Sequence, residues 1–181
     1  MINWCFVAGA ICDKAPMILV NLTQADEIVS ARVGLERVET SRLKGYENSY
    51  KISTDTNYFG NVMANSGAVA AEIAVAKALG FNDFKPTCNT FKSIADVGAD
   101  IEVRWTAWLG GTLIVHPKDR DSDIAVLVVG MSPNMRVVGW IPISAAKRPK
   151  YRHSKDDAWW VSQINLHPIE TLMRSQYAPS I

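Results

Sequence analysis

Residues 94–106 read IADVGADIEVRWT, a pattern typical of a β-hairpin. The tripeptide 97–99 can form its loop, because Gly98 can take a backbone conformation that other residues disfavour. In that register Asp96 lies opposite Asp100, and residues two apart share a face of the sheet. A two-residue turn would shift the pairing and send Asp96 to the opposite face, so this prediction depends on the loop.

Charged side chains then gather on one face of the hairpin. They are Asp96, Asp100, Glu102 and Arg104. The apolar residues between them, Ile101, Val103 and Trp105, face the core. Gathered carboxylates repel each other unless something positive lies among them, and hard oxygen ligands suit Mg²⁺ or Mn²⁺. Such an ion can lower the pKa of a bound water and neutralise charge on a phosphodiester, so the pattern predicts a metal-assisted hydrolytic site.

Two helices are predicted upstream of the hairpin. Residues 17–22 form a short β-type run, and Thr23 then begins an amphipathic helix over residues 24–43. A polar loop is predicted over residues 46–65, followed by an alanine-rich helix over residues 66–80, which a glycine ends. This second helix is apolar on nearly all sides, so we expect it to be buried against a sheet.

Downstream, the chain is mostly β. Candidate strands lie at residues 93–97, 100–107, 111–116, 124–130, 136–141 and 159–164. Gly110-Gly111 and Pro133-Asn134 are predicted hairpin turns, and a last helical turn follows Pro168. Helices followed by a run of strands are typical of an α+β domain.

The length of 181 residues fits a single domain over residues 1–181, with a lead-in at 1–16, a core over 17–172 and a tail at 173–181. A net charge of +1 gives no support to a polybasic protein, and the average composition excludes a disordered tail or a coiled coil. The odd number of cysteines favours a reducing cytosol. No segment reaches the ~20 apolar residues that span a bilayer, which predicts a soluble, cytoplasmic protein without a membrane partner.

The sequence does not support a calcium loop, a zinc site or a known nucleotide-binding or nucleophile motif. The aspartates of residues 116–123 have the spacing of a calcium loop, but isoleucine and glycine stand where its glycine and bidentate glutamate belong. We therefore predict a polar hairpin there. The cysteines and histidines have no zinc spacing, and no nucleophile elbow, Walker loop or dinucleotide fingerprint occurs.

One carboxylate, Glu72, interrupts the apolar surface of the alanine-rich helix. With this helix, Asp96 before a hairpin and Glu102-Val103-Arg104 on the next strand, the chain resembles the PD-(D/E)XK nucleases, which include restriction endonucleases and Holliday-junction resolvases. The core of that superfamily has a helix carrying Glu, a metal-binding Asp and a Glu-x-Lys strand, in this order. The resemblance implies a restriction-endonuclease-like α+β core with a mixed central sheet flanked by helices.

The chain also resembles a group of uncharacterised phage-type proteins of this superfamily. The shared stretches are AVAKALG at 74–80, DVG at 96–98, IEVR at 101–104 and VGW at 138–140. The likeness covers residues 17–172 in general layout, although its specific motifs occupy few positions. It implies DNA as the partner and a cytoplasmic location, which is the host cytoplasm for a viral protein, and it is compatible with a homodimer.

The resemblance implies a metal-dependent nuclease that hydrolyses DNA phosphodiester bonds, in the manner of an endodeoxyribonuclease that uses Mg²⁺ or Mn²⁺. Asp96 and Glu102 would bind the metal ion, and Glu72 would bind a second ion or orient a water. Arg104 would stabilise the charge on the phosphate under attack. Asp100 is a reserve ligand.

Arg104 stands where the superfamily has lysine. Arginine can balance charge, but it is too basic to exchange a proton near neutral pH. Several alternatives stay open. The enzyme tolerates arginine, or Lys92 or Lys77 fills the role, or the protein is a catalytically degenerate module that binds nucleic acid or inhibits without cutting. A structural virion or interaction protein that binds neither metal nor nucleic acid is a further alternative.

Each candidate also has a purely structural interpretation. Glu72 could be an exposed helix residue paired with a lysine, and Asp96 or Asp100 could be a turn residue beside glycine. Glu102 and Arg104 could be alternating charges on a solvent-facing edge strand. The arrival of all these elements in the order of the superfamily favours the site over these separate interpretations.

Basic residues cluster at 147–153, where Tyr151 lies among them. The candidates for phosphate contact are Lys147, Arg148, Lys150 and Arg152. A solvated surface loop is the alternative. We expect the tryptophans, Trp159 and Trp160 included, to be core residues rather than base-stacking platforms, with these two on opposite faces if they lie in a strand.

Overall fold

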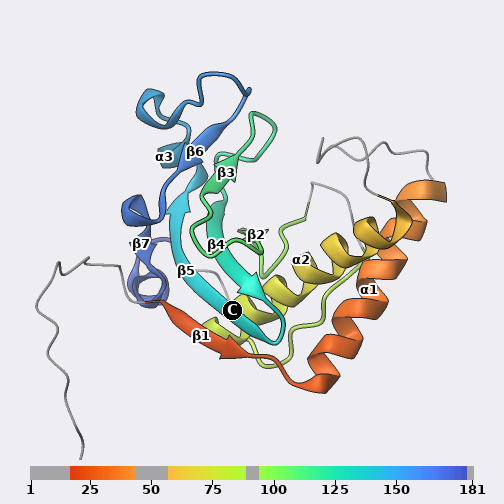
Figure 1. Ribbon diagram of the computed structural model, residues 1–181. Helices are drawn as coiled ribbons and strands as arrows, with labels where there is room; N and C mark the ends of the chain where they lie inside the picture. The colour runs from red at the N-terminus through yellow and green to blue at the C-terminus, as the bar shows by residue number, and fades with distance from the viewer. Residues whose placement is uncertain (1–16, 44–56, 89–93, 179–181) are drawn as a thin grey trace, which may run out of the picture.

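The computed structural model describes residues 17–43, 57–88 and 94–178 (Figure 1). The predicted lead-in and most of the predicted polar loop lie outside the described residues. The elements in chain order are β1 (Ile18–Asn21), α1 (Gln24–Leu43), α2 (Tyr58–Leu79), β2 (Ile101–Thr106), β3 (Leu113–Val115), β4 (Ile124–Met131), β5 (Asn134–Pro142), α3 (Ile143–Ala146), η1 (Pro149–Tyr151), β6 (Trp159–Val161), η2 (Gln163–Asn165), β7 (His167–Pro168) and η3 (Ile169–Arg174). The predicted α+β class, with a mixed central sheet flanked by helices, is confirmed.

The central sheet is 5-stranded, in the order β1-β5-β4-β2, with β7 paired to β5 at its C-terminal part. β4 and β5 form an antiparallel hairpin around Ser132-Pro133, one residue earlier than predicted, and β1 runs antiparallel to β5. β2 pairs with β4 in parallel, beginning with Ile101 opposite Ile124. The parallel pair makes the sheet mixed and leaves β2, which carries several candidate residues, at the edge.

The sheet is covered on both faces. α2 lies between α1 and the sheet (Figure 1), and its residues 69–76 are buried. Glycine allows this close packing, because a Cβ on Gly34 of α1 would come within 2.4 Å of the Ser66 Oγ, and one on Gly67 within 2.3 Å of the Trp105 ring. On the other face, α3 and the small sheet of β3 and β6 enclose a second apolar cluster.

Both long helices begin at side-chain caps. At the start of α1 the Thr23 N–H donates to Asp26 Oδ2 (2.7 Å), and the Asp26 N–H donates to Thr23 Oγ1 (3.3 Å). At the start of α2, Asn57 Oδ1 accepts a first-turn N–H at 2.9 Å. The loop predicted over residues 46–65 is therefore wrong from residue 58 onward. The end of α2 is as predicted, with Gly80 in the left-handed conformation at φ 82°.

Two predicted strand features differ from the structure. Among the described residues of 93–97, Val97 forms only an isolated bridge with Ile101, so no strand is present there. The turn at Gly110-Gly111 joins β2 to β3, but β3 pairs with β6. The reason is that β2 has β4 as its ladder partner, so β3 turns away to build the small sheet.

α2 is long and apolar enough, by length and composition, to span a membrane, and it is the one such helix among the described residues. Half of that apolar window, 50%, is buried inside the protein. Packing against α1 and the sheet accounts for its composition, as in the core helix of a globular domain.

Candidate active site

The hairpin that carries the candidate carboxylates has a loop shifted by one residue from the predicted position. Val97 and Ile101 pair through two backbone hydrogen bonds of 3.1 and 3.2 Å, so the loop is 98–100. Gly98 has a positive φ of 63°, which this loop requires and other residues rarely adopt. Asp100, the predicted reserve ligand, is therefore a loop residue whose carbonyl accepts the first N–H of β4 (2.8 Å).

In this register Asp96 comes opposite Glu102 rather than Asp100. Glu102 and Arg104 share a face of β2, whereas Asp96 lies outside any strand, so the predicted common face of the three residues holds only for these two. Asp96 Oδ2 accepts the backbone N–H of Val103 at 2.8 Å, which fixes its carboxylate against the neighbouring strand. The hairpin thus brings the candidate Asp and the candidate Glu together.

Glu72 lies in the protein interior and binds Arg37 of α1. Arg37 Nη1 and Nη2 donate to the two carboxylate oxygens at 2.6 and 2.8 Å. Arg37 also donates through Nε and Nη2 to the Thr87 carbonyl, at 3.0 and 2.8 Å. Burial raises the pKa of Glu72 to about 7, against the lowering effect of Arg37, and the negative charges of Asp96 and Glu102 add to the rise. The interpretation of Glu72 as an exposed residue paired with a lysine is wrong.

Arg104 joins three parts of the chain. Its Nη1 lies 3.2 Å from Glu102 Oε2, and its Nη2 lies 2.7 Å from Asp119 Oδ2. Its Nε donates to the carbonyl of Ile114 in β3 at 3.2 Å. The backbone N–H of His116 donates to the same oxygen of Asp119 at 2.8 Å. These partners hold the guanidinium beside Glu102, with its side chain only 17% exposed.

The pKa values of the carboxylates are shifted in different directions. Burial raises the pKa of Asp96, against its backbone hydrogen bond and the charges of Arg104 and Arg37. Burial also raises the pKa of Glu102, and the negative charge of Asp96 adds to the effect. Burial acts in the same direction on Asp119, but there Arg104 and the backbone N–H outweigh it and hold the pKa of that carboxyl below its usual range.

The site therefore combines carboxylates from four segments with two guanidinium groups. The carboxylates are those of Glu72, Asp96, Glu102 and Asp119, and the guanidinium groups are those of Arg37 and Arg104. When every carboxylate is ionised, the negative charges exceed the positive ones by the charge of one divalent cation. Such an excess in a largely buried cluster favours the binding of a cation.

Sequence reasoning missed Arg37 and Asp119. Asp119 belongs to the segment interpreted as a polar hairpin, and its calcium-like spacing with neighbouring aspartates was the only signal there. Arg37 lies on α1 among the residues of an amphipathic pattern and contacts a residue 35 positions away. Neither contact is visible before α1 is docked on α2 and the 116–123 segment is folded against β2.

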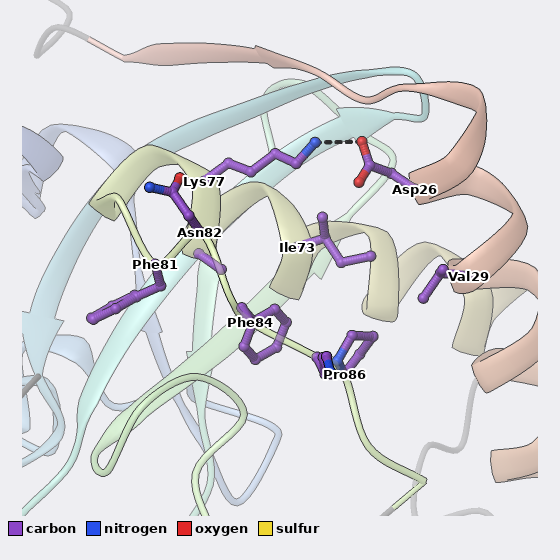
Figure 2. Close-up of a pocket in the computed structure, with 10 residues that line it drawn as sticks. Asp26, Val29, Ile73, Lys77, Phe81, Asn82, Phe84 and Pro86 are labelled. Atoms are coloured by element: carbon purple, nitrogen blue, oxygen red, sulfur yellow. Dashed lines mark hydrogen bonds and ion pairs between the residues drawn. The ribbon is translucent and has the colours of Figure 1, made fainter.

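Lys77, one of the two candidate substitutes for a catalytic lysine, is paired away from the carboxylates of the site. Lys77 forms an ion pair with Asp26 of α1, at the rim of an apolar depression between α1, α2 and the 81–86 segment (Figure 2). Phe84 and Pro86 also line this depression. Lys92 lies outside the described residues.

No group of three His, Cys, Asp or Glu side chains in the part of the chain that the structure describes is arranged to hold a metal ion. Arg37 and Arg104 bind the carboxylates of Glu72 and Glu102. Mg²⁺ usually keeps several waters and takes only one or two protein carboxylates. The hard oxygen donors of Asp96 and Glu102, which lie close enough for the charge of Asp96 to raise the pKa of Glu102, fit such an ion in kind and in charge.

The predicted phosphate-binding residues have different surroundings. Lys147 Nζ donates to the carbonyls of Pro117 and Asp119, at 3.1 and 2.6 Å, and to Asp121 Oδ1 at 2.6 Å. It therefore ties the 116–123 segment to the end of α3. The other basic side chains, Arg148, Lys150 and Arg152, are exposed.

A scan against protein-family models found no matching model, and searches of curated proteins and of solved structures found no matching protein. The membership of the PD-(D/E)XK superfamily that the motifs imply therefore stays a prediction, and so do the roles of its site residues.

Proposed function

We propose that this protein is a metal-dependent nuclease that hydrolyses DNA phosphodiester bonds at a site centred on Asp96 and Glu102. The observation that carries the proposal is that the Asp96 carboxylate accepts the backbone N–H of Val103, the residue next to Glu102, at 2.8 Å, while Arg104 binds Glu102 at 3.2 Å. Their raised pKa values and the excess of negative charge around them support the binding of a divalent cation between them.

Asp96 and Glu102 would hold Mg²⁺ or Mn²⁺. The ion would lower the pKa of a bound water and neutralise charge on the phosphate. Arg104 is permanently charged and would stabilise the additional negative charge of the phosphate under attack. Glu72 has both oxygens bound by Arg37, so we assign it to orientation of a water rather than to a second metal ion.

The order of the elements supports a restriction-endonuclease-like core as part of the same proposal. A helix carrying Glu72, a hairpin carrying Asp96 and a strand carrying Glu102 follow one another around one end of a mixed sheet. We further propose the cytoplasmic location of a phage protein acting on DNA, as the resemblance implies.

The test is incubation of the purified chain with supercoiled, linear and single-stranded DNA plus Mg²⁺ or Mn²⁺, with EDTA as the control. Metal-dependent cleavage that Glu102→Ala abolishes, while circular dichroism shows an intact fold, would support the proposal. Glu170→Gln, which changes an exposed carboxylate of η3, is the matched control and should leave cleavage unchanged. Cleavage retained in Glu102→Ala, with unchanged metal affinity, would contradict it.

One observation favours a second candidate, a catalytically degenerate module that binds nucleic acid. Both guanidinium groups are bound to carboxylates of the site, and Arg104 cannot exchange a proton near neutral pH. DNA binding without cleavage, together with no heat and no thermal stabilisation on addition of Mn²⁺, would favour this candidate over the nuclease.

A further inference from the structure

β6 places two neighbouring tryptophans on opposite faces of the small β3–β6 sheet. Trp159 pairs with the buried Val115 on the face that packs into the core, while Trp160 pairs with Ile114 on the outer face. The side chain of Trp160 is 38% exposed. The two tryptophans lie on opposite faces, as predicted. The expectation that Trp160 is a core residue is wrong, because only the inner face of this small sheet packs against the core.

Trp160 forms a flat aromatic pair with His153. The ring centroids lie 4.2 Å apart and the ring planes are inclined by 15°. Parallel rings at this separation stack as a nucleobase does on an aromatic side chain. The backbone N–H of His153 donates to the carbonyl of Ala158 at 2.9 Å, which holds His153 beside β6. The aromatic pair is therefore formed in advance of any ligand.

The segment that carries the aromatic pair is rich in basic residues, although His153 Nδ1 itself lies 2.9 Å from Asp156 Oδ2. Residues 147–160 include five Lys or Arg and two Asp. Arg152 lies 4.6 Å over the Trp159 ring and forms an ion pair with Asp157, so its positive charge already has a partner within the protein. The other exposed cations of this segment are Arg148, Lys150 and Lys155. The net positive charge favours a polyanion as the partner of this surface.

The aromatic pair lies one strand away from the candidate active site. Ile114, the ladder partner of Trp160, accepts a hydrogen bond at its carbonyl from Arg104 Nε at 3.2 Å. Arg104 in turn binds Glu102 at 3.2 Å. β3 therefore links the aromatic pair on β6 to the arginine of the candidate active site.

We propose that the His153–Trp160 pair is a stacking site for an unpaired nucleobase, so that the preferred substrate is single-stranded DNA. The proposal rests on the proposed function and deepens it by naming the substrate class. In a duplex both faces of an internal base are covered by its neighbours, so only an unpaired base can stack on this pair. Arg148, Lys150 and Lys155 would bind the flanking phosphates.

The test is fluorescence anisotropy with a labelled single-stranded oligodeoxynucleotide and with the same strand in a duplex, in EDTA so that no cleavage occurs. We expect the chain to bind the single strand more tightly. Trp160→Ala should weaken single-strand binding by about 5- to 150-fold, the loss associated with one stacked base. Trp160→Phe should retain most of the affinity. Trp108→Ala, which removes another exposed tryptophan (70% exposed), is the matched control and should bind normally.

If Trp160→Ala fails to fold, as judged by circular dichroism, His153→Ala replaces it and should also weaken single-strand binding. Equal single-strand affinity of the folded variant and the unchanged chain, or duplex binding as tight as single-strand binding, would overturn the inference. Because the assay contains no metal, its result is separate from that of the cleavage test. Binding that depends on Trp160 without cleavage in Mg²⁺ or Mn²⁺ would contradict the nuclease and leave the stacking site standing.

Discussion

Arg37 of α1 and Glu72 of α2 form a two-point ion pair, with donor–acceptor distances of 2.6 and 2.8 Å, in the interior beside the hairpin. The side chains are only 11% and 4% exposed. Arg37 also binds the Thr87 carbonyl, so one guanidinium joins both long helices to the segment that leads toward Asp96. Arg37 therefore fixes the Glu72 carboxylate between the two long helices and the Thr87 backbone.

Removal of Arg37 should be strongly destabilising, because it leaves the Glu72 carboxylate buried without its partner. We expect Arg37→Ala to lower the free energy of unfolding at pH 8 by ~3–5 kcal/mol, measured by urea unfolding. The loss should be smaller at pH 5, where Glu72 can take up a proton.

Arg32→Ala, which changes an exposed arginine of the same helix, is the matched control and should change the free energy of unfolding by less than ~0.5 kcal/mol. The double variant Arg37→Met/Glu72→Met should recover much of the loss, since no charge is then buried. An Arg37→Ala variant as stable as the Arg32→Ala control would refute this account of the ion pair.

The stability of the metal-free protein should fall as the pH rises. Folding raises the pKa of Glu72 from 4.5 to about 7, so the folded state holds the proton more tightly than the unfolded state. The contribution of Glu72 to the free energy of unfolding is then greatest below pH 4.5 and is lost as the pH rises through about 7, whereas the lowered pKa values of Asp119 and Asp26 act in the opposite direction at lower pH. The raised pKa values of Asp96 and Glu102 act with the same sign.

Glu72→Gln removes the titrating group and should flatten this dependence by on the order of 3 kcal/mol. Urea unfolding of both proteins across this pH range provides the measurement. Parallel curves for the unchanged chain and Glu72→Gln would show that Glu72 does not carry the effect.

Lys147 should act on stability more than on DNA contact. Its three hydrogen bonds hold the segment that carries Asp119, so Lys147→Met should lower the free energy of unfolding by ~1.5–3 kcal/mol. Arg148→Met is the neighbouring control. It should leave stability unchanged and reduce the slope of log DNA affinity against log salt by ~1. The reverse assignment, with Lys147→Met altering only the salt slope, would be inconsistent with the contacts of Lys147.

Much of this arrangement follows from local sequence. The start of α1 is encoded by Thr23 and Asp26, as predicted. The amphipathic pattern predicted for this helix is wrong, because its buried residues are Ser30, Val33 and Gly34 while Ile28 and Leu35 are exposed. The shared face of Glu102 and Arg104 could be predicted because strand residues alternate.

The rest depends on contacts between distant parts of the chain. The polar first turns of α2 are helical because Asn57 caps them and because Ser66 packs against Gly34 of α1. The pairing of Arg37 with Glu72, and of Arg104 with Asp119, requires helices and loops to be docked on the sheet. The helix and strand propensities of single residues cannot predict such contacts between distant parts of the chain.

The most direct test of the central claim is isothermal titration of the full chain with Mn²⁺. We predict a single binding event that Asp96→Asn and Glu102→Gln each abolish, whereas Asp100→Asn and Glu170→Gln retain it, because the proposed site is centred on the first two carboxylates, whose charges act on each other. Absence of heat and of thermal stabilisation in the unchanged chain, or equal Mn²⁺ binding by Asp96→Asn, would contradict the claim that Asp96 and Glu102 together hold a divalent cation.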